Sequence, residues 1–319
     1  MDASLTSVDV VILSLDREKE TLRLLESIAK QRGPEYHVWL VDQGSQPSSL
    51  AALKGGLEGF EALTLIELGE NTGVAKGRNI GIRAGEAPCI VCIDNDAYFE
   101  DPDSLARAAA RFAEQAGVGA ISFKICEPGG AISRSSWPFG SSVPFTQEVP
   151  CLVAQFAGAA HALRREAVHQ TELHDEKLFF YWEELDLSYQ LIHAGYSILY
   201  DPNIRIVHDH SASARLSWKT GRYYYLVRNG LYVRYKYERS RRGFLLYAGG
   251  YLLRGLRNGV FVQALRGVRD SLRWVEQMDE GSEPARDPAV LEYVWLHNLR
   301  MRGSLVRRFL REALARLPE

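Results

Sequence analysis

The sequence predicts an α/β protein with a mostly parallel central sheet flanked by helices, followed by a C-terminal helical extension. Three observations predict this fold class. Apolar runs of strand length recur in the first 125 residues, segments of helical periodicity lie between them, and arginine-rich amphipathic stretches follow residue 235. The length of 319 residues, with 46% hydrophobic and 24% charged residues, is typical of a globular protein with a large core.

Five apolar runs are predicted to be strands covered on both faces, because their hydrophobicity is nearly continuous. They span residues 8–15, 37–42, 63–68, 89–94 and 118–125. The clearest helix signal starts at Asp16, the expected N-cap, continues through Leu22, Leu25 and Ile28 at helical spacing, and ends at Gly33. Ligands of such sheets bind beyond the carboxyl ends of the strands, so we expect the functional site at that rim.

Charge is distributed unevenly along the chain. The net charge of -2 does not indicate a nucleic-acid-binding protein, yet 21 Lys and Arg stand against 10 Asp and Glu from Ser211 onward. The four cysteines lie in apolar surroundings without the spacing of a zinc site, as expected in a reducing compartment. Neither a signal peptide nor a run of 18 uncharged apolar residues is found, so a cytoplasmic location is expected.

Polar residues follow three of the predicted strands and should share one rim of the sheet. They are Ser14, Asp16, Arg17, Asp42, Gln43, Gly44, Ser45, Asp94, Asn95 and Asp96. A helix cap or Asx-turn would explain any one of them, and for Asp16 we favour that interpretation. Asp94 and Asp96 are two residues apart, so on an extended chain they point the same way. Mg²⁺ or Mn²⁺ would relieve their repulsion, and these ions commonly complete their shell with substrate phosphate oxygens.

The segment ENTGVAKGRNIGIRAG, residues 70–85, also indicates a phosphate ligand. Lys76 and Arg78 supply positive charge near the start of a predicted helix, where free backbone N–H groups favour anions. Gly73, Gly77 and Gly81 recur every four residues, which indicates close packing of this helix on the sheet. Both interpretations can hold together.

The joint order of these motifs resembles the family-2 glycosyltransferases, especially the bacterial branch that contains rhamnosyltransferases. The motifs VDQGS, NTGVAKGRNIGI, DND and FFYWEELDLSYQLIHAGYSILYDPNIRIVHDHSAS occur in sequence between residues 8 and 235. The resemblance implies a GT-A fold over residues 1–235, with a nucleotide-binding half (1–125), an acceptor-side half (126–235) and a helical basic region (236–319). It also implies inverting, metal-dependent transfer of a sugar from a nucleoside diphosphate to a hydroxyl acceptor in polysaccharide, glycolipid or natural-product assembly.

The resemblance assigns roles around the donor. It places Asp42 at the nucleotide base, Asp94 near the ribose and the metal, and Asp96 on the metal. His208, in preference to His210, would complete the metal shell. We assign the remaining donor contacts to Ser14, Asp16, Arg17, Lys76, Arg78 and Asn95.

A catalytic base is predicted in the second half. The stretch YWEELDLSYQLIHAGY should be a helix with Glu183, Glu184 and Asp186 in its first turn, where acids are also favoured for purely structural reasons. The resemblance places Glu184 where the family's base, usually an aspartate, deprotonates the acceptor hydroxyl. The longer side chain moves the carboxylate by about 1 Å, so Glu183 or Asp186 could share the task.

Partners follow from the same resemblance. UDP or dTDP is the expected nucleotide, the acceptor is a glycan, lipid-linked or small-molecule hydroxyl, and no nucleic acid is expected. Residues 243–274 should form a basic amphipathic helix, for which peripheral contact with the inner membrane face, a solvated face and a homo-oligomer interface stay open. An acidic linker is predicted over residues 276–288. A catalytically silent nucleotide-sugar-binding subunit and a nucleotidyltransferase are the alternative functions.

Overall fold

The computed structural model describes residues 7–133, 136, 148–209, 217–281, 288–297, 305–315 and 317. The chain divides into two compact units. The first consists of residues 1–179 and 183–211, and the second of residues 180–182 and 212–319. The domain boundary predicted at residue 235 falls inside helix α7 (Tyr223–Glu238) of the second unit.

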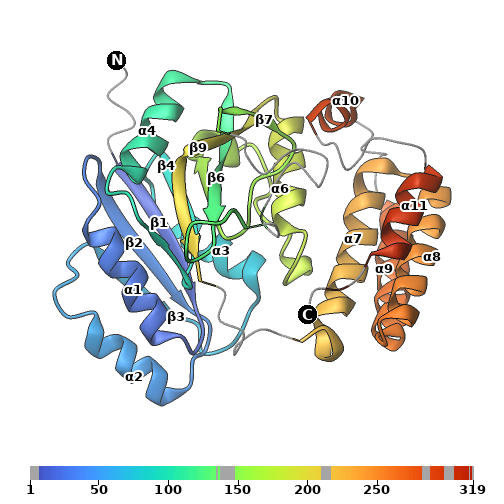
Figure 1. Ribbon diagram of the computed structural model, residues 1–319, viewed down its shortest axis with the longest axis horizontal. Coiled ribbons are helices and arrows are strands. Elements are labelled where there is room, and N and C mark those ends of the chain that lie inside the picture. The colour runs from blue at the N-terminus through green and yellow to red at the C-terminus, as the bar shows by residue number, and fades with distance from the viewer. Residues whose placement is uncertain are drawn as a thin grey trace. The chain divides into compact units, whose positions relative to one another are not determined.

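A nine-stranded sheet forms the centre of the first unit, in the order β3-β2-β1-β4-β8-β6-β9-β5 with β7 paired to β9 (Figure 1). The strands are β1 (Ser7–Ser14), β2 (Glu35–Asp42), β3 (Leu63–Glu67), β4 (Cys89–Asp94), β5 (Ala97–Phe99), β6 (Val118–Cys126), β7 (Cys151–Val153), β8 (Ala160–Arg164) and β9 (Ser197–His208). All five strands predicted from apolar runs are confirmed. Burial on both faces is complete along β6, but β3 at the edge of the sheet has only half-buried and exposed residues, so the predicted cover on both faces is wrong for that strand.

The direction and register of the strands place the predicted polar residues at one edge of the sheet. Strands β3, β2, β1 and β4 are parallel to one another, whereas β8 runs antiparallel between β4 and β6. Ser14 at the end of β1 pairs with Asp42 of β2, and the preceding Leu13 pairs with Asp94 of β4. The residues that follow these strands therefore meet at one edge of a mixed, largely parallel sheet.

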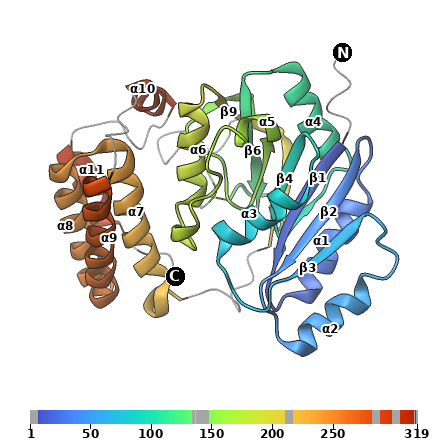
Figure 2. The same ribbon diagram turned by 180° about the vertical axis from the view of Figure 1, so that it is seen from behind.

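Helices lie on both faces of this sheet (Figures 1 and 2). They are α1 (Glu18–Ala29), α2 (Pro47–Gly56), α3 (Val74–Ala84), α4 (Ser104–Glu114), α5 (Arg165–Val168) and α6 (Glu183–His193), with a 3-10 turn η2 (Glu176–Leu178). Helix α3 approaches the sheet closely through its glycines, because a Cβ at Gly81 would lie 2.5 Å from Cγ1 of Val11. The close packing predicted from the glycine spacing is therefore confirmed.

Asp16 does not cap helix α1, contrary to the sequence prediction. The helix begins at Glu18 with Arg17 in the N-cap position, and no side chain caps it. Asp16 has a φ of +51° and its carboxylate accepts a hydrogen bond from the Gln46 N–H at 2.6 Å. The prediction failed because the turn after β2 offers this carboxylate a backbone donor that is distant in sequence.

The second unit is helical. Among the described residues it contains a π-helical turn η4 (Trp218–Arg222), α7, α8 (Arg241–Arg257), α9 (Phe261–Gly281), α10 (Pro288–His297) and α11 (Leu305–Leu314). Tyr223, Val227 and Leu231 of α7 pack with Tyr251 of α8 and Ala264 of α9 in its core. No helix in the described ranges is long and apolar enough to cross a membrane.

The linker predicted over residues 276–288 is wrong in its first part. Helix α9 continues to Gly281, because its apolar spacing extends past Trp274 to the buried Val275. The acidic composition that suggested a linker belongs to the last turns of this helix.

Candidate active site

The Asp94–Asn95–Asp96 motif lies where β4 ends and β5 begins. Asp94 is the last residue of β4, and Asn95 and Asp96 form the turn that leads into β5. Strand β5 pairs antiparallel with β9 so that Ala97 lies opposite His208. This register brings Nε2 of His208 to 2.9 Å from Oδ1 of Asp96. The two acids therefore converge at a turn, not along an extended strand as predicted.

Asp94, Asp96 and His208 form a candidate metal site. Each offers a ligand atom, and these atoms all lie within 4.8 Å of one another. Two carboxylates and an imidazole are a donor set that suits Mn²⁺, and Mg²⁺ also accepts the carboxylates. The structure thus brings together the three residues predicted as metal ligands. His210 lies outside the described residues.

Two arginines supply the positive charge that faces these carboxylates. Arg17, the N-cap residue of α1, donates to Oδ2 of Asp96. Arg78, from α3, donates to Oδ1 of Asp94 at 2.9 Å. Each aspartate therefore has its own guanidinium partner, which offsets the repulsion between the two acids.

The two aspartates differ strongly in acidity. Burial raises the pKa of Asp94 to about 6, against the opposing charges of Arg78 and His208. Burial also acts on Asp96, but the hydrogen bond and charge of His208 and the charge of Arg17 together lower the pKa of Asp96 to about 2. Asp96 therefore stays ionised throughout the neutral pH range. Asp94 becomes protonated at a pH just below that range, near its pKa of about 6.

Arg78 connects the candidate metal site to the predicted base. Its side chain is only 3% exposed, and one terminal nitrogen donates to Oε1 of Glu184 at 2.8 Å. The other terminal nitrogen donates to Asp94 and, at 2.7 Å, to the carbonyl oxygen of Gly158. The guanidinium that was predicted to contact the donor is thus held between two carboxylates that were also predicted as site residues.

The adjacent glutamates of α6 have different environments. Glu184 is 20% exposed in its side chain and is ion-paired with Arg78. Glu183 is buried, and its Oε2 has no hydrogen-bond partner among the described residues. Burial and the neighbouring charge of Glu184 raise the pKa of Glu183 well above its usual range. Burial thus disfavours the charged form of Glu183, whereas Glu184 is the residue of the pair whose side chain is partly exposed.

Asp186, the third predicted catalytic acid, lies in the interior. It is fully buried, and its Oδ2 accepts a hydrogen bond from Nε2 of Gln190, one turn further along α6. This position is suited to stabilising the helix and leaves no surface for a substrate.

Gly158 was missed by the sequence analysis. A Cβ at this position would overlap Oε1 of Glu184, and its carbonyl oxygen holds Arg78. The absence of a side chain therefore makes room for the longer glutamate. The only sequence signal was the run of small residues around it, GAA at 158–160.

Two buried histidines near Arg78 were also missed. Nδ1 of His161 lies 2.9 Å from the carbonyl oxygen of Ala157, and Nδ1 of His174 lies 3.4 Å from that of Glu183. Burial and the charge of Arg78 lower the pKa of both rings, to about 3 for His174. Both rings are therefore neutral, and the cationic charge in this interior belongs to Arg78.

The other predicted donor residues lie along the rim, with different exposure. Asp42 is buried and its carboxylate accepts hydrogen bonds from the Gly44 and Ser45 N–H groups, at 3.1 and 3.0 Å. Ser14 is buried beside Thr21, whose hydroxyl also accepts from Asn95. The remaining two, Asp16 and Lys76, are exposed.

Gln43, which follows β2 at the rim, had no predicted role, yet it links two motifs. Its side-chain amide donates to the carbonyl oxygen of Gly73, and its Oε1 accepts from the N–H and hydroxyl of Thr72. These bonds fix the loop before α3 against the turn after β2.

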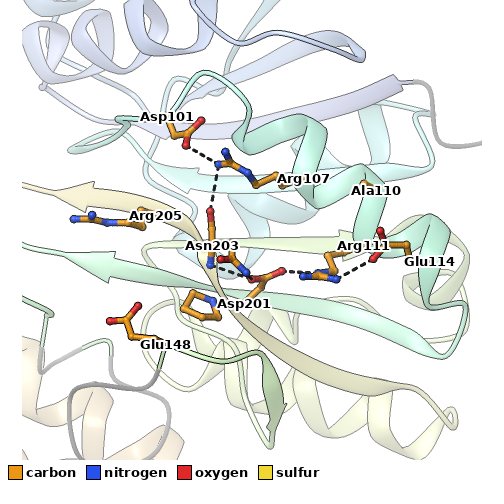
Figure 3. A pocket seen from close by; sticks show the side chains of 10 residues that line it. Asp101, Arg107, Ala110, Arg111, Glu114, Glu148, Asp201, Asn203 and Arg205 are labelled. Carbon is orange, nitrogen blue, oxygen red and sulfur yellow. Dashed lines mark hydrogen bonds and ion pairs between the residues drawn. The ribbon is translucent and has the colours of Figure 1, made fainter.

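A separate open cavity of about 600 Å³ lies between α4 and β9 (Figure 3). Its arginines are already paired: Arg107 with Asp101, and Arg111 with Asp201 and Glu114. The other two charged residues drawn there, Arg205 and Glu148, have partners outside the lining, Glu100 and Lys124.

Three of the four cysteines are buried. All four are free thiols, and burial raises the pKa of Cys89 and of Cys92 to about 12. These two side chains serve as apolar core residues of β4.

Comparison with known families identifies the chain. The sequence model of the family described as "Glycosyl transferase family 2" matches residues 9–171. The chain belongs to this family. The match includes the Asp94–Asn95–Asp96 motif and Arg78 and ends 12 residues before Glu183.

Curated relatives of this family-2 chain are distant. An uncharacterized protein of Haemophilus influenzae is 26% identical over 169 residues, which are 51% of this chain and 90% of that protein. A teichoic acid poly(glycerol phosphate) polymerase of Staphylococcus epidermidis is 27% identical over 34% of this chain but only 14% of its own length. An uncharacterized glycosyltransferase of Bacillus subtilis is 30% identical over 29% of this chain and 33% of its own length.

Solved structures share the fold. The Pyrobaculum calidifontis mannosyltransferase in complex with GDP-Man and Mn²⁺ has a TM-score of 0.55 at 17% identity, covering 96% of this chain and 84% of that one. GalNAc-T7 with UDP, GalNAc and Mn²⁺ has a TM-score of 0.62 at 16% identity, covering 86% and 57%. TarS of S. aureus has a TM-score of 0.54 at 17% identity, covering 86% and 91%. These likenesses confirm the GT-A fold predicted from the motifs.

Proposed function

We propose that this family-2 glycosyltransferase moves a sugar from a nucleoside diphosphate to an acceptor hydroxyl, with inversion at the anomeric carbon and with a divalent cation. One observation carries the proposal: Arg78 joins Asp94 of the candidate metal site to Glu184 through bonds of 2.9 and 2.8 Å. A metal site for the leaving diphosphate and a carboxylate for the acceptor hydroxyl are the two groups that inverting transfer requires.

Mg²⁺ or Mn²⁺ is the proposed cofactor. Asp94, Asp96 and His208 would hold it, and the solved structures of the mannosyltransferase and GalNAc-T7 contain Mn²⁺. A bound divalent cation neutralises charge that develops on a departing diphosphate. Arg17 and Arg78, which face these carboxylates in the structure, would move or share them when the cation binds.

Glu184 is the proposed base. As the acceptor oxygen forms its bond to the anomeric carbon, the bond from that carbon to the diphosphate oxygen breaks, and the hydroxyl proton passes to the Glu184 carboxylate. A positioned base of this kind contributes about 10² to 10⁴ in rate. Glu183 is less suited to this role because burial disfavours the charged form of its carboxyl.

Arg78 is the proposed positioning residue for that base. It holds Oε1 of Glu184 from one side, while Gly158 provides the space that the carboxylate occupies. A guanidinium that is only 3% exposed and makes three directed bonds restricts the carboxylate to one location. This restriction would offset the longer reach of glutamate relative to the family's usual aspartate.

The donor and acceptor are proposed as classes. UDP or dTDP is the expected nucleotide, while solved structures with the same fold are complexes with GDP-Man, UDP and UDP-GlcNAc. The acceptor is a hydroxyl of a glycan, a lipid-linked glycan or a small molecule, and the rhamnosyltransferase-like branch stays a prediction from the motifs.

Thermal denaturation with nucleotides tests this function. The melting temperature of the purified protein is measured with UDP, dTDP, GDP and CDP, each with and without Mn²⁺. A ligand at about 100 times its dissociation constant stabilises the folded state by about 2.7 kcal/mol, so binding is readily detected. We expect a Mn²⁺-dependent shift for one nucleotide that Asp96→Ala abolishes and that Asp103→Ala, at a distant surface aspartate, leaves unchanged.

Two results would contradict the proposal. The absence of a shift with all four nucleotides would favour a catalytically silent relic of the fold. A metal-dependent shift without sugar transfer, but with release of pyrophosphate from a nucleoside triphosphate, would favour a nucleotidyltransferase.

A further inference from the structure

Helices α8 and α9 expose an unusual number of large apolar side chains. Of the fifteen such side chains that are exposed among the described residues, seven lie on these two helices. The exposed fraction is 70% for Leu245, 64% for Leu256, 64% for Val262 and 52% for Leu265. Leaving these groups in water is costly, since burying a leucine contributes about 1.5 to 3 kcal/mol.

The apolar residues form one stripe on each helix. On α8, Leu245, Leu253 and Leu256 are separated by eight and three residues, which is helical spacing for a single face. On α9, Phe261, Leu265 and Leu272 are separated by four and seven residues, and they also share a face.

The two stripes lie on the same side of the α8–α9 hairpin. The helices run side by side in both views (Figures 1 and 2), and they touch where a Cβ at Gly255 would lie 2.9 Å from Cβ of Ala264. Leu256 and Leu265 each follow one of these contact residues, so each is rotated about 100° from the contact. Because the helices are antiparallel, these rotations carry both leucines to the same side.

Helix α11 borders this surface. A Cβ at Gly249, in the α8 stripe, would lie 3.7 Å from Phe309 of α11. Helix α11 itself exposes Val306, Leu310 and Leu314, each by 47% or more. The apolar surface therefore extends over three helices of the second unit.

Arginines surround the apolar stripes. Residues 241–273 contain seven arginines and a single acid, Asp270. Arg242 on α8 and Arg266 on α9 are exposed examples. Basic side chains beside exposed leucines fit a surface that offers both anionic headgroups and an apolar layer.

We propose that this face, defined as Leu245, Leu253, Leu256, Phe261, Leu265 and Leu272 with their flanking arginines, docks on an anionic lipid bilayer. A second copy of the chain is disfavoured because a two-fold interface sets the same patch against itself, so the net positive charge of one patch would face that of the other. A nucleic acid would contact the arginines through its phosphates but would leave the exposed leucines in water.

Cosedimentation of the full chain with vesicles tests this proposal. The vesicles are phosphatidylcholine alone or phosphatidylcholine with phosphatidylglycerol. We expect binding only to the anionic vesicles, weakened by salt. The double variant Leu256→Glu with Leu265→Glu should bind about tenfold more weakly or worse, because it removes apolar contact and adds negative charge. Arg242→Gln and Arg266→Gln should each weaken binding about fivefold.

The matched control is Leu152→Glu in β7, where the leucine is 39% exposed in the first unit. It should leave vesicle binding unchanged. Equal loss of binding in this control, equal binding to neutral vesicles, or no binding to either vesicle would overturn the proposal. Sedimentation velocity on the same variants identifies the competing occupant, since loss of a dimer without any vesicle binding would assign the face to a second copy. The nucleotide-dependent melting shift does not depend on these leucines, so failure here leaves the proposed transferase function standing.

Discussion

The first unit buries charged side chains in pairs, whereas the helical unit exposes apolar ones. In the first unit Arg78 is 3% exposed and bonded to two carboxylates, and Arg165 forms a buried ion pair with Asp9 at 2.7 Å. Only three of the fifteen exposed large apolar side chains of the described residues belong to that unit, and twelve belong to the helical unit. Catalysis uses charged groups that are held in fixed positions away from water. Docking on a partner instead requires exposed apolar groups that lose their contact with water on binding.

Loss of the Glu184 carboxylate should have the largest effect. Glu184→Gln is expected to lower the rate of transfer by about 10² to 10⁴ while donor binding persists, because the base is lost and the metal site is not. Turnover and the nucleotide-dependent melting shift are measured on the same protein.

The matched control for this change is the adjacent residue. Glu183→Gln replaces a buried carboxyl, whose charged form burial disfavours, with a neutral group of the same shape, so transfer should stay near the wild-type rate. If Glu183→Gln proved as damaging as Glu184→Gln, the assignment of the base to one glutamate would be lost.

Loss of the Arg78 charge should destabilise the first unit. Arg78→Gln leaves Asp94 and Glu184 without their shared partner. Removing one member of a buried ion pair lowers the free energy of unfolding by about 3 kcal/mol or more. Urea denaturation measures this change in the free energy of unfolding. Arg83→Gln, whose partner Glu176 lies at the surface, should cost less than about 1 kcal/mol. Equal losses at both positions would remove the contrast between buried and surface pairs.

Mn²⁺ affinity should depend on pH through Asp94. A cation binds the ionised carboxylate, and burial raises the pKa of Asp94 to about 6. Affinity should therefore fall by about tenfold or more for each pH unit below about 6. Asp96, with a pKa of about 2, adds no change in this range. Calorimetric titration with Mn²⁺ at several pH values checks the slope, and a pH-independent affinity would exclude Asp94 as a ligand.

Substitutions on the apolar face of the helical unit should have the smallest effect on stability. Leu245→Glu alters a side chain that is 70% exposed, so the free energy of unfolding should change by less than about 0.5 kcal/mol. Leu231→Ala in the core of the same unit should cost about 2 to 5 kcal/mol. If Leu245→Glu destabilised the chain as much as Leu231→Ala, that face would be part of the packed interior.

The strands and the grouping of the acids could be predicted because they depend on local patterns. Buried parallel strands have continuous apolar runs, and parallel strands end at one rim, so Asp42 and Asp94 had to lie close together. The glycine spacing of α3 likewise predicted its close contact with the sheet.

The charges that face those acids could not be predicted from local patterns. Arg78 meets Glu184 across 106 positions of the chain, and Arg17 meets Asp96 across 79. Glu183 and Glu184 are identical neighbours in the sequence, and only tertiary packing buries one and leaves the other partly exposed. Asp16 was misassigned for the same reason, because its partner Gln46 is 30 residues away.

The most direct test of the transferase account is an anomalous-scattering map from crystals grown with Mn²⁺ and UDP or dTDP. The account predicts one strong metal peak bonded to Asp94, Asp96 and His208, with the nucleotide diphosphate beside it. A nucleotide bound elsewhere, or a manganese peak that none of these three residues contacts, would contradict it.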